Sequence, residues 1–159
     1  MKFLKLLFFS IFLLSLFSCG GDDDICVSGE ATPRMKIKFK TQASGKLKTL
    51  DSLFIKVDYG NGPIAVVANA SKTDSVIIPL RVDDSPFTKI YVGLSKDAVN
   101  SVIKINYNTV SEYVSPACGI KKTYKDLNSI VETPAAVLSV EQNQNQITDE
   151  SKTHLFLLF

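Results

Sequence analysis

The chain has 159 residues, 45% of them hydrophobic, with 18 Lys and Arg against 16 Asp and Glu. Two of the lysines, Lys2 and Lys5, lie in an N-terminal leader of 18 residues, and without it the remaining 141 residues are formally neutral. A neutral chain of this length can bury the core of one domain, and it has no basic surplus with which to bind nucleic acid or anionic lipid head groups.

The leader, residues 1–18, has the pattern of a secretory signal peptide. Lys2 and Lys5 supply a short positive region, and residues 6–17 form an apolar run that is interrupted only by serines. That run is shorter than the roughly 20 residues that a membrane-spanning helix needs. It is apolar on all sides, so it also lacks the single apolar stripe of a helix that packs against a protein core. We therefore predict that residues 1–18 direct export and are then removed.

The four residues Leu16-Phe17-Ser18-Cys19 resemble the lipobox, which is the cleavage and lipidation site of bacterial lipoproteins. Leu16, the small Ser18 and Cys19 match its pattern, whereas a residue smaller than Phe17 is more usual at that position. The resemblance implies cleavage before Cys19, with lipid on this cysteine and the membrane as a partner through that lipid. Each buried methylene contributes about 0.8 kcal/mol, so two or three acyl chains hold a protein firmly. The alternative is an ordinary secretory signal that contains a cysteine.

A polar tether, residues 19–33, follows the leader. Residues 20–24, with the sequence GGDDD, combine glycines with clustered carboxylates that cannot bury apolar surface. They resemble the acidic export signal that routes Bacteroidetes-type lipoproteins to the cell surface. The resemblance implies an outer-membrane lipoprotein that faces the cell exterior. A periplasm-facing lipoprotein is the alternative, because any tether tends to be polar and acidic.

From residue 34 onwards, apolar strand patterns alternate with turn signals, and no long stretch shows a 3.6-residue apolar period. Strands are predicted over 35–40, 53–59, 64–68, 76–80, 90–94, 101–110 and 153–159, with weaker candidates at 113–114, 119–124 and 136–140. The sequence GNGP at residues 60–63 predicts a hairpin turn. One helical turn is predicted at 97–100, and the polar residues 141–152 are predicted to form an exposed loop. The strand spacing predicts one all-β domain over 34–159, an antiparallel sandwich with an Ig-like or related Greek-key topology, with a small closed barrel as the alternative.

The two cysteines other than Cys19 are Cys26 and Cys118, an even pair in an oxidising compartment. A disulfide between them is predicted on that ground, and it would close a loop of about 90 residues. The chain-entropy estimate for such a loop is about 4–5 kcal/mol. Two reduced thiols, or a bond to another chain, are the alternatives.

No residue pattern predicts catalysis, a metal site or a cofactor. His154 is the only histidine, and it lies inside the last apolar strand, where a packed or edge residue is more common than a catalytic one. The serines follow no nucleophile-elbow pattern, and no glycine-rich phosphate loop precedes a helix. The carboxylates Asp83 and Asp84, like those of residues 22–24, lack the regular ligand spacing of a calcium loop. We therefore expect a protein that is not an enzyme and that holds no metal or cofactor.

A sugar-binding face is an alternative use of the aromatic residues, because exposed rings form platforms for carbohydrate. The chain has no Trp, and its five tyrosines lie mostly at predicted strand positions, where core packing explains them equally well. They are Tyr59, Tyr91, Tyr107, Tyr113 and Tyr124.

Two Asp-Ser motifs, at residues 51–53 and 74–76, resemble the three-residue O-glycosylation acceptor of Bacteroidetes, in which Asp is followed by Ser or Thr and then by an apolar residue. Each motif opens a predicted strand, where a hydroxyl could be accessible. The resemblance implies glycans on Ser52 and Ser75. Ordinary turn chemistry at a strand entrance is the alternative.

Several short motifs together resemble a family of small, uncharacterised Bacteroidetes-type lipoproteins. They are the acidic tether between Cys19 and Cys26, the Thr-Pro at residues 32–33, and the Cys-Gly at residues 118–119. The resemblance implies a location and a fold but no ligand. We expect a non-catalytic envelope or cell-surface module that binds an unknown protein or glycan. A glycan-binding or hydrolase-accessory protein of the outer membrane is the alternative.

Overall fold

The computed structural model describes residues 31–116 and 118–159. These two ranges contain ten strands and no helix, and hence no helix that could cross a membrane. The strands are β1 (Met35–Lys40), β2 (Leu53–Asp58), β3 (Pro63–Ala70), β4 (Ser75–Ile78), β5 (Phe87–Gly93), β6 (Ser101–Ser115), β7 (Gly119–Thr133), β8 (Ser139–Gln142), β9 (Gln146–Ile147) and β10 (Thr153–Leu158). The prediction of an all-β fold is confirmed.

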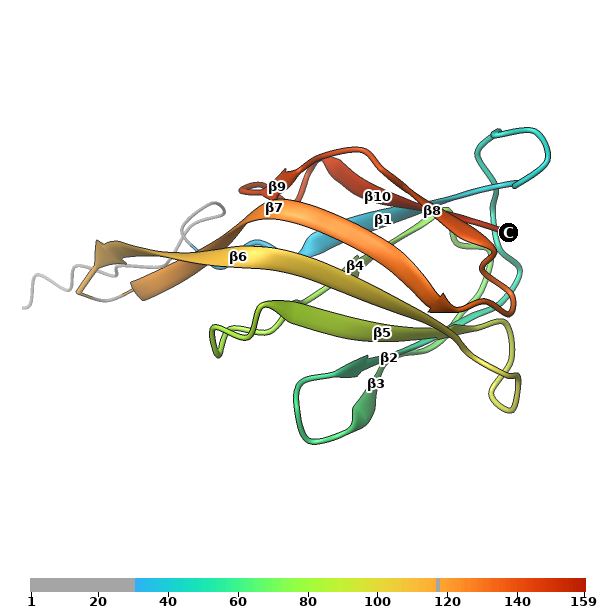
Figure 1. The fold of residues 1–159 in the computed structure, drawn as a ribbon, viewed down its shortest axis with the longest axis horizontal. Coiled ribbons are helices and arrows are strands. Elements are labelled where there is room, and N and C mark those ends of the chain that lie inside the picture. The colour runs from blue at the N-terminus through green and yellow to red at the C-terminus, as the bar shows by residue number, and fades with distance from the viewer. Residues whose placement is uncertain (1–30, 117) are drawn as a thin grey trace, which may run out of the picture.

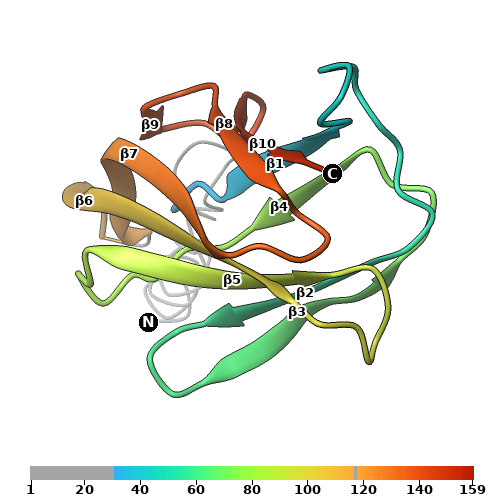
Figure 2. The same cartoon turned by 45° about the vertical axis from the view of Figure 1, so that its right-hand side comes forward.

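The ten strands form two sheets that pack face to face as a sandwich (Figures 1 and 2). One sheet has four strands in the order β4-β1-β10-β8, and the other has six in the order β3-β2-β5-β6-β7-β9. The pairing of β1 with β10 is parallel, and the other strand pairings in the described ranges are antiparallel. The predicted sandwich is therefore confirmed, with a parallel pair at the centre of its smaller sheet.

The core lies between the sheets and follows the period-two pattern of the strands. In β1, Met35, Ile37 and Phe39 are fully buried, while the lysines that alternate with them are half-buried. The same alternation holds in β2, in β5 and in the first half of β6. The facing apolar rows exclude water from the space between the sheets, and each Å² of apolar surface removed from water contributes about 25 cal/mol.

The hairpin predicted at the glycine-rich turn is present between β2 and β3. Gly60 and Gly62 have φ values of 104° and 95°, a region that glycine adopts without a steric penalty. The Asp58 carboxylate accepts hydrogen bonds from both of these amides, at 2.7 and 3.2 Å. The turn therefore fixes β3 beside β2 at one edge of the larger sheet.

The prediction of a helical turn at residues 97–100 is wrong. This segment belongs to the loop between β5 and β6, and the Ala98 amide donates a 3.3 Å hydrogen bond to the Ser95 carbonyl in an isolated turn. This turn brings Asn100 back close to Gly93 at the end of β5.

The prediction of an exposed loop over residues 141–152 is wrong in part. Strand β8 continues to Gln142, and the short β9 pairs with β7 through Ile147, which is fully buried. Ile147 lies opposite the buried Tyr124, and the Leu127 amide donates a 2.9 Å hydrogen bond to the Asn145 carbonyl, so both contacts hold this segment against the sheet. The polar composition around Ile147 conceals that contact in the sequence.

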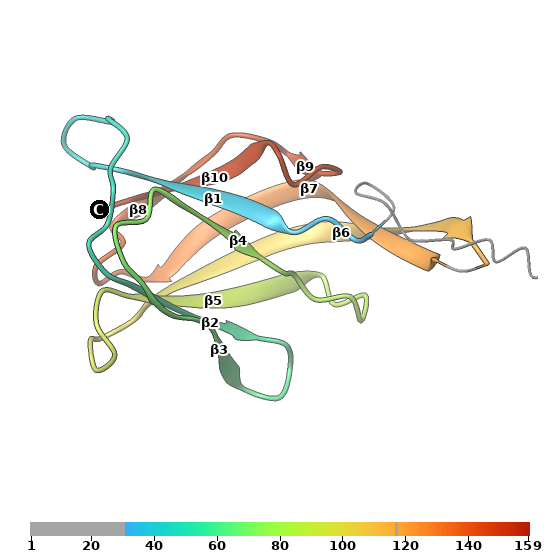
Figure 3. The same ribbon diagram turned by 180° about the vertical axis from the view of Figure 1, so that it is seen from behind.

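The hairpin of β6 and β7 is longer than the sequence predicts. Each strand has 15 residues, whereas the pattern predicts that the first of them ends at Val110. Beyond the pair Val110–Thr123 the hairpin extends past the ends of the other strands (Figures 1 and 3). We call this projecting part, residues 111–115 and 119–122, the arm.

Candidate functional site at the edge strand β3

A sheet with an unprotected edge can pair with another chain, and natural proteins shorten or charge their edge strands to prevent it. In the described ranges the four edges are β4, β8, β3 and β9. Strands β4 and β8 have four residues each, β9 has two, and β8 also carries Glu141. Strand β3 has eight residues and no charged side chain. Among these edges, β3 is the one best suited to bind a further strand.

Strand β3 is apolar but largely exposed to solvent. Its sequence is PIAVVANA, and Ile64 keeps 55% of its surface exposed. Val66, Val67 and Ala70 pack in part against the core. The inner edge of β3 pairs with β2, and no backbone hydrogen bond joins its outer edge to another described residue. An apolar strand in this position has the backbone groups and the surface to which a second strand can add.

A pocket of about 340 Å³ lies beside β3 on the outer face of the larger sheet. Phe54 and Lys56 line it because they alternate with the buried residues of β2 and so point away from the core. Its volume falls in the range of ligand pockets, about 300–1,000 Å³. The lining residues are Phe54, Lys56, Ala65, Val67, Ala68, Lys96, Asp97 and Asn100.

Two bulges in β3 shape this pocket. The register against β2 shifts between Leu53 and Ile55 and again between Ile55 and Lys56, and at each shift β3 contains one extra residue. A bulge interrupts strict alternation and re-aims the neighbouring side chains. Val67 and Ala68 can therefore both line the pocket although they are adjacent in sequence.

Gly93 allows the loop between β5 and β6 to close against the pocket. A β-carbon at Gly93 would lie 2.7 Å from Oδ1 of Asn100, closer than these atoms can approach. Gly93 also pairs with Phe54 across β2 and β5, so the missing side chain leaves room beside that ring. The sequence alone gives no signal for this approach, because it depends on the pairing of distant strands.

The pocket carries more positive than negative charge. Lys56 and Lys96 are exposed, and neither forms an ion pair with another described residue. Asp97 is the one carboxylate among the described lining residues. A carboxylate on a ligand would thus be attracted to the rim, with about 0.2–1 kcal/mol for each exposed pair.

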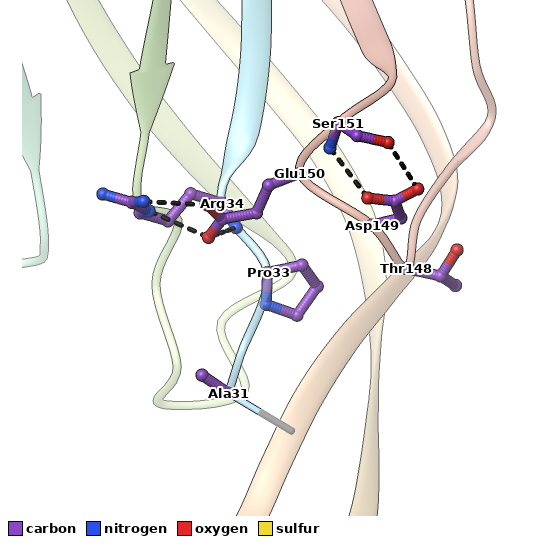
Figure 4. Close-up of a pocket in the computed structure, with 7 residues that line it drawn as sticks. All are labelled: Ala31, Pro33, Arg34, Thr148, Asp149, Glu150 and Ser151. Atoms are coloured by element: carbon purple, nitrogen blue, oxygen red, sulfur yellow. Dashed lines mark hydrogen bonds and ion pairs between the residues drawn. The ribbon is translucent and has the colours of Figure 1, made fainter. Parts of the chain in front are cut away.

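A second pocket, of about 650 Å³, lies where the chain enters β1 (Figure 4). Each of its charged groups has a hydrogen-bond partner within the pocket. The Arg34 guanidinium donates to both carboxylate oxygens of Glu150 at 2.8 Å, and Asp149 accepts from the amide and the hydroxyl of Ser151 at 2.7 Å. These hydrogen bonds lower the pKa values of the Glu150 and Asp149 carboxyl groups. The Arg34–Glu150 pair joins the start of β1 to the turn before β10. Few polar groups in this pocket are left without a partner and free to bind a ligand.

His154 has a structural role. Its side chain is 1% exposed, and its Nδ1 accepts a 2.9 Å hydrogen bond from the Lys36 amide. That bond lies where the register between β1 and β10 shifts, so the imidazole supplies an acceptor that the strand ladder lacks there. Burial lowers the pKa of His154 and favours the neutral ring. In the described ranges no three metal-binding side chains come together.

The five tyrosines do not gather on one face. Tyr107 and Tyr124 are buried with their ring centroids 4.9 Å apart, edge to face, and burial raises the pKa of both. Tyr59 is half-buried and donates to a backbone carbonyl. Tyr91 is half-buried on β5, and Tyr113 lies on the arm, 67% exposed. These positions do not form a continuous aromatic platform for a sugar.

The two Asp-Ser motifs lie close together at one edge of the sandwich. Ser52 immediately precedes β2 and Ser75 begins β4, so both stand at strand entrances as predicted. The chain crosses between the sheets at these points, and Leu50 and Thr73 join the two crossings through hydrogen bonds of 2.8 and 3.0 Å. Both serines are half-buried, and the Ser75 hydroxyl donates to Asp74 at 3.0 Å. Glycosylation at these serines stays a prediction.

Cys19 and Cys26, like the leader at residues 1–18, lie outside the described residues. Lipid attachment, cleavage and the disulfide therefore stay predictions. Cys118 lies at the end of the arm, half-buried, and its amide donates a 3.1 Å hydrogen bond to the Ser115 hydroxyl.

Asp83 and Asp84 bind separate cationic side chains. Asp83 accepts hydrogen bonds from the Arg81 guanidinium, which lowers its pKa to about 2. Asp84 contacts the Lys122 ammonium at 2.7 Å. Each carboxylate is thus neutralised by its own partner, and the two do not converge on a cation site.

The model of a family of unknown function (DUF6452) matches residues 52–159, from the residue before β2 to the last residue. No curated protein and no solved structure matches the chain. The matched part contains β3 and the pocket beside it.

Proposed function

This chain belongs to the family of unknown function DUF6452, and we propose that it is a non-catalytic, lipid-anchored envelope module that binds an extended segment of a partner protein along β3. The observation that carries this proposal is the exposed edge strand of eight residues, without charge, whose outer edge pairs with no described strand. The pocket beside it adds a recess for a side chain.

Strand addition explains how such a site would recognise its partner. Backbone hydrogen bonds to the open edge supply affinity, and pockets for alternate side chains supply specificity. The apolar part of the pocket, at Phe54 and Ala65, suits an apolar side chain, while Lys56 and Lys96 suit a carboxylate. We therefore infer that the partner offers an extended, apolar segment that carries an acidic residue.

The membrane anchor is part of the same proposal. The lipobox ending at Cys19 and the acidic tether support lipidation, an outer-membrane location and an orientation toward the cell exterior, with a periplasm-facing orientation as the alternative. Fractionation of cells that express Cys19→Ala tests the anchor. The variant should leave the membrane fraction, and a variant that still pellets with membranes and resists salt extraction would contradict lipidation.

Site-specific photo-crosslinking tests the partner site. A benzophenone amino acid replaces Ala68, which is exposed on β3 and lines the pocket, in the lipoprotein made by its native host. Irradiation of intact cells should give one discrete adduct, whose second component mass spectrometry identifies. The matched control carries the same group at Leu138, which is 53% exposed between β7 and β8.

Two results would count against the proposal. The same adduct from both positions, or none from Ala68, would show that β3 is not the binding site. An adduct of twice the mass of the chain would show that a second copy, rather than a different protein, covers the strand.

Glycosylation of Ser52 and Ser75 is a further proposal, supported by their motifs and by their place at strand entrances. Intact-mass measurement of the protein from its native host tests it. We expect a mass above that of the lipidated chain, and a mass equal to the lipidated chain would remove the idea.

A further inference from the structure

The arm carries an apolar pair that takes no part in the sandwich core. Tyr113 and Ile120 lie directly opposite each other across β6 and β7, and they are 67% and 63% exposed. Side chains of directly opposed residues share one face of a hairpin. The two side chains therefore form one exposed patch with an aromatic and an aliphatic half.

The charged side chains around this patch are paired. Glu112 and Lys121 lie 3.3 Å apart across the arm, and Lys122 contacts Asp84 at 2.7 Å. An unpaired charge is expensive to bring into the hydrocarbon core of a bilayer, and pairing with an opposite charge reduces that cost. The electrostatics of the arm therefore present little opposition to contact with a bilayer.

The described chain starts beside the arm. Thr32 accepts a 2.9 Å hydrogen bond, through its hydroxyl, from the Lys122 amide, and Lys122 lies about 7 Å along the strand from Ile120. The twelve Cα steps from Cys19 to Ala31 can span at most about 43 Å. A lipid on Cys19 is thus tied to the end of the domain that carries the exposed pair.

We propose that Tyr113 and Ile120 enter the interfacial region of the membrane leaflet that holds the lipid of Cys19. The lipid would then be one contact and the arm a second, so that the domain has a fixed orientation. Tyrosine suits this depth because its ring is apolar while its hydroxyl stays hydrated. This inference rests on the lipid anchor of the proposed function.

The orientation has a consequence for the binding site. The loop between β5 and β6, which lines the pocket, lies at the opposite end of β6 from the arm (Figure 1). Val99 in this loop is 77% exposed and lies two residues before β6, whose ten steps from Ser101 to Ser111 at the base of the arm span about 33 Å. An arm held at the membrane therefore keeps the pocket directed away from it and open to a partner.

The absence of tryptophan from the chain permits a direct test. The full lipidated protein is prepared as Tyr113→Trp and, separately, as Ile120→Trp, and each is reconstituted into phosphatidylcholine vesicles with or without lipid brominated near the head group. Val99→Trp is the matched control. We expect blue-shifted emission that brominated lipid quenches at positions 113 and 120, and unshifted, unquenched emission at position 99.

Flotation of the same vesicles tests the lipid anchor separately from the insertion of the arm. Protein that does not float would overturn the lipid anchor and this inference together. Protein that floats, with emission at 113 and 120 as insensitive to bromine as emission at 99, would overturn this inference alone. Circular dichroism identifies any variant that has not folded, and the other arm position then provides the decisive reading.

Discussion

Strand β1 lies in the middle of its sheet between β4 and β10, whereas strand β3 lies at the edge of the other sheet. Alternate side chains of β1 are fully buried, and the residues between them are lysines. Strand β3 is more apolar than β1, yet its side chains are exposed or at most half-buried. Apolar content alone therefore does not decide burial in this molecule, because the neighbours of a strand decide it.

This difference in burial suggests that β1 contributes to stability, whereas β3 is available for recognition of a partner. A buried residue such as Phe39 contributes to the free energy of unfolding because water is excluded from its whole surface. An exposed residue such as Ile64 contributes little to folding and keeps its apolar surface available for a partner. Changes in the two strands should therefore affect different measurements.

The largest expected loss of stability is in the core, and it is seen when the same substitution, Phe to Ala, is made in the core and at the pocket. Phe39→Ala should lower the free energy of unfolding by about 3–5 kcal/mol, because Phe39 is fully buried and packs edge to face on Phe159 at 5.9 Å. Phe54→Ala should cost about 1 kcal/mol, because Phe54 is half-buried on the outer face. Urea unfolding measures both, and equal losses would remove the distinction between core and site.

A smaller loss of stability is expected when the pH is lowered. The group that titrates is His154, which lies in the body of the sandwich. Burial lowers the pKa of His154 below the value of about 6.5 in an unfolded chain; Lys152 adds to this shift and Asp149 opposes it. As the pH falls, the unfolded chain binds the proton first, so this part of the stability is complete above about pH 6.5 and is lost below it. The urea midpoint should therefore fall between about pH 7 and about pH 5.

The control for this pH dependence is His154→Gln, which does not titrate but can still accept a hydrogen bond from the Lys36 amide. Its profile should be flatter over the same range. An unchanged slope would assign the pH dependence to other groups, and a midpoint that rises on acidification would contradict a buried neutral histidine.

The smallest expected effect on stability comes from charging β3. The double variant Ile64→Lys, Ala68→Lys should unfold within about 0.5 kcal/mol of the natural protein, because both positions are exposed. It should nevertheless lose its partner, because lysine on an edge strand opposes the addition of another strand. Leu138→Lys should preserve both properties. Co-purification, without crosslinking, of the partner that the crosslinking experiment identifies measures binding, and an undiminished yield from the double variant would contradict the role of β3.

Strands with one buried face were predictable from sequence because burial on one side imposes alternation. The prediction for β1 agrees with the structure over residues 35–40, whereas the final strand was predicted from a continuous apolar run. The parallel pairing of β1 with β10 was not predictable, because it joins segments more than 100 residues apart. The arm was predicted only in part, as weak strand candidates at 113–114 and 119–124, because its exposed strands alternate weakly and gain no buried face.

The candidate site was predictable only in part. The glycine-rich turn correctly indicated a β2–β3 hairpin, but no local pattern shows that the outer side of β3 stays open. The pocket depends on Gly93 and Asn100 meeting across a loop, and on bulges that shift the register of β3. The sequence motifs singled out Ser52 and Ser75. These serines lie near each other because the Leu50–Thr73 bridge joins the two segments that contain them.

Hydrogen–deuterium exchange of the β3 amides tests the central claim most directly. The lipoprotein is labelled once in native envelope fractions and once after purification in detergent, and peptides that cover residues 63–70 are compared with peptides from β1. Strand addition predicts slow exchange in β3 in the envelope and fast exchange after purification, while β1 exchanges slowly in both. Equal, fast exchange of β3 in both samples would contradict the proposal that a partner strand covers this edge.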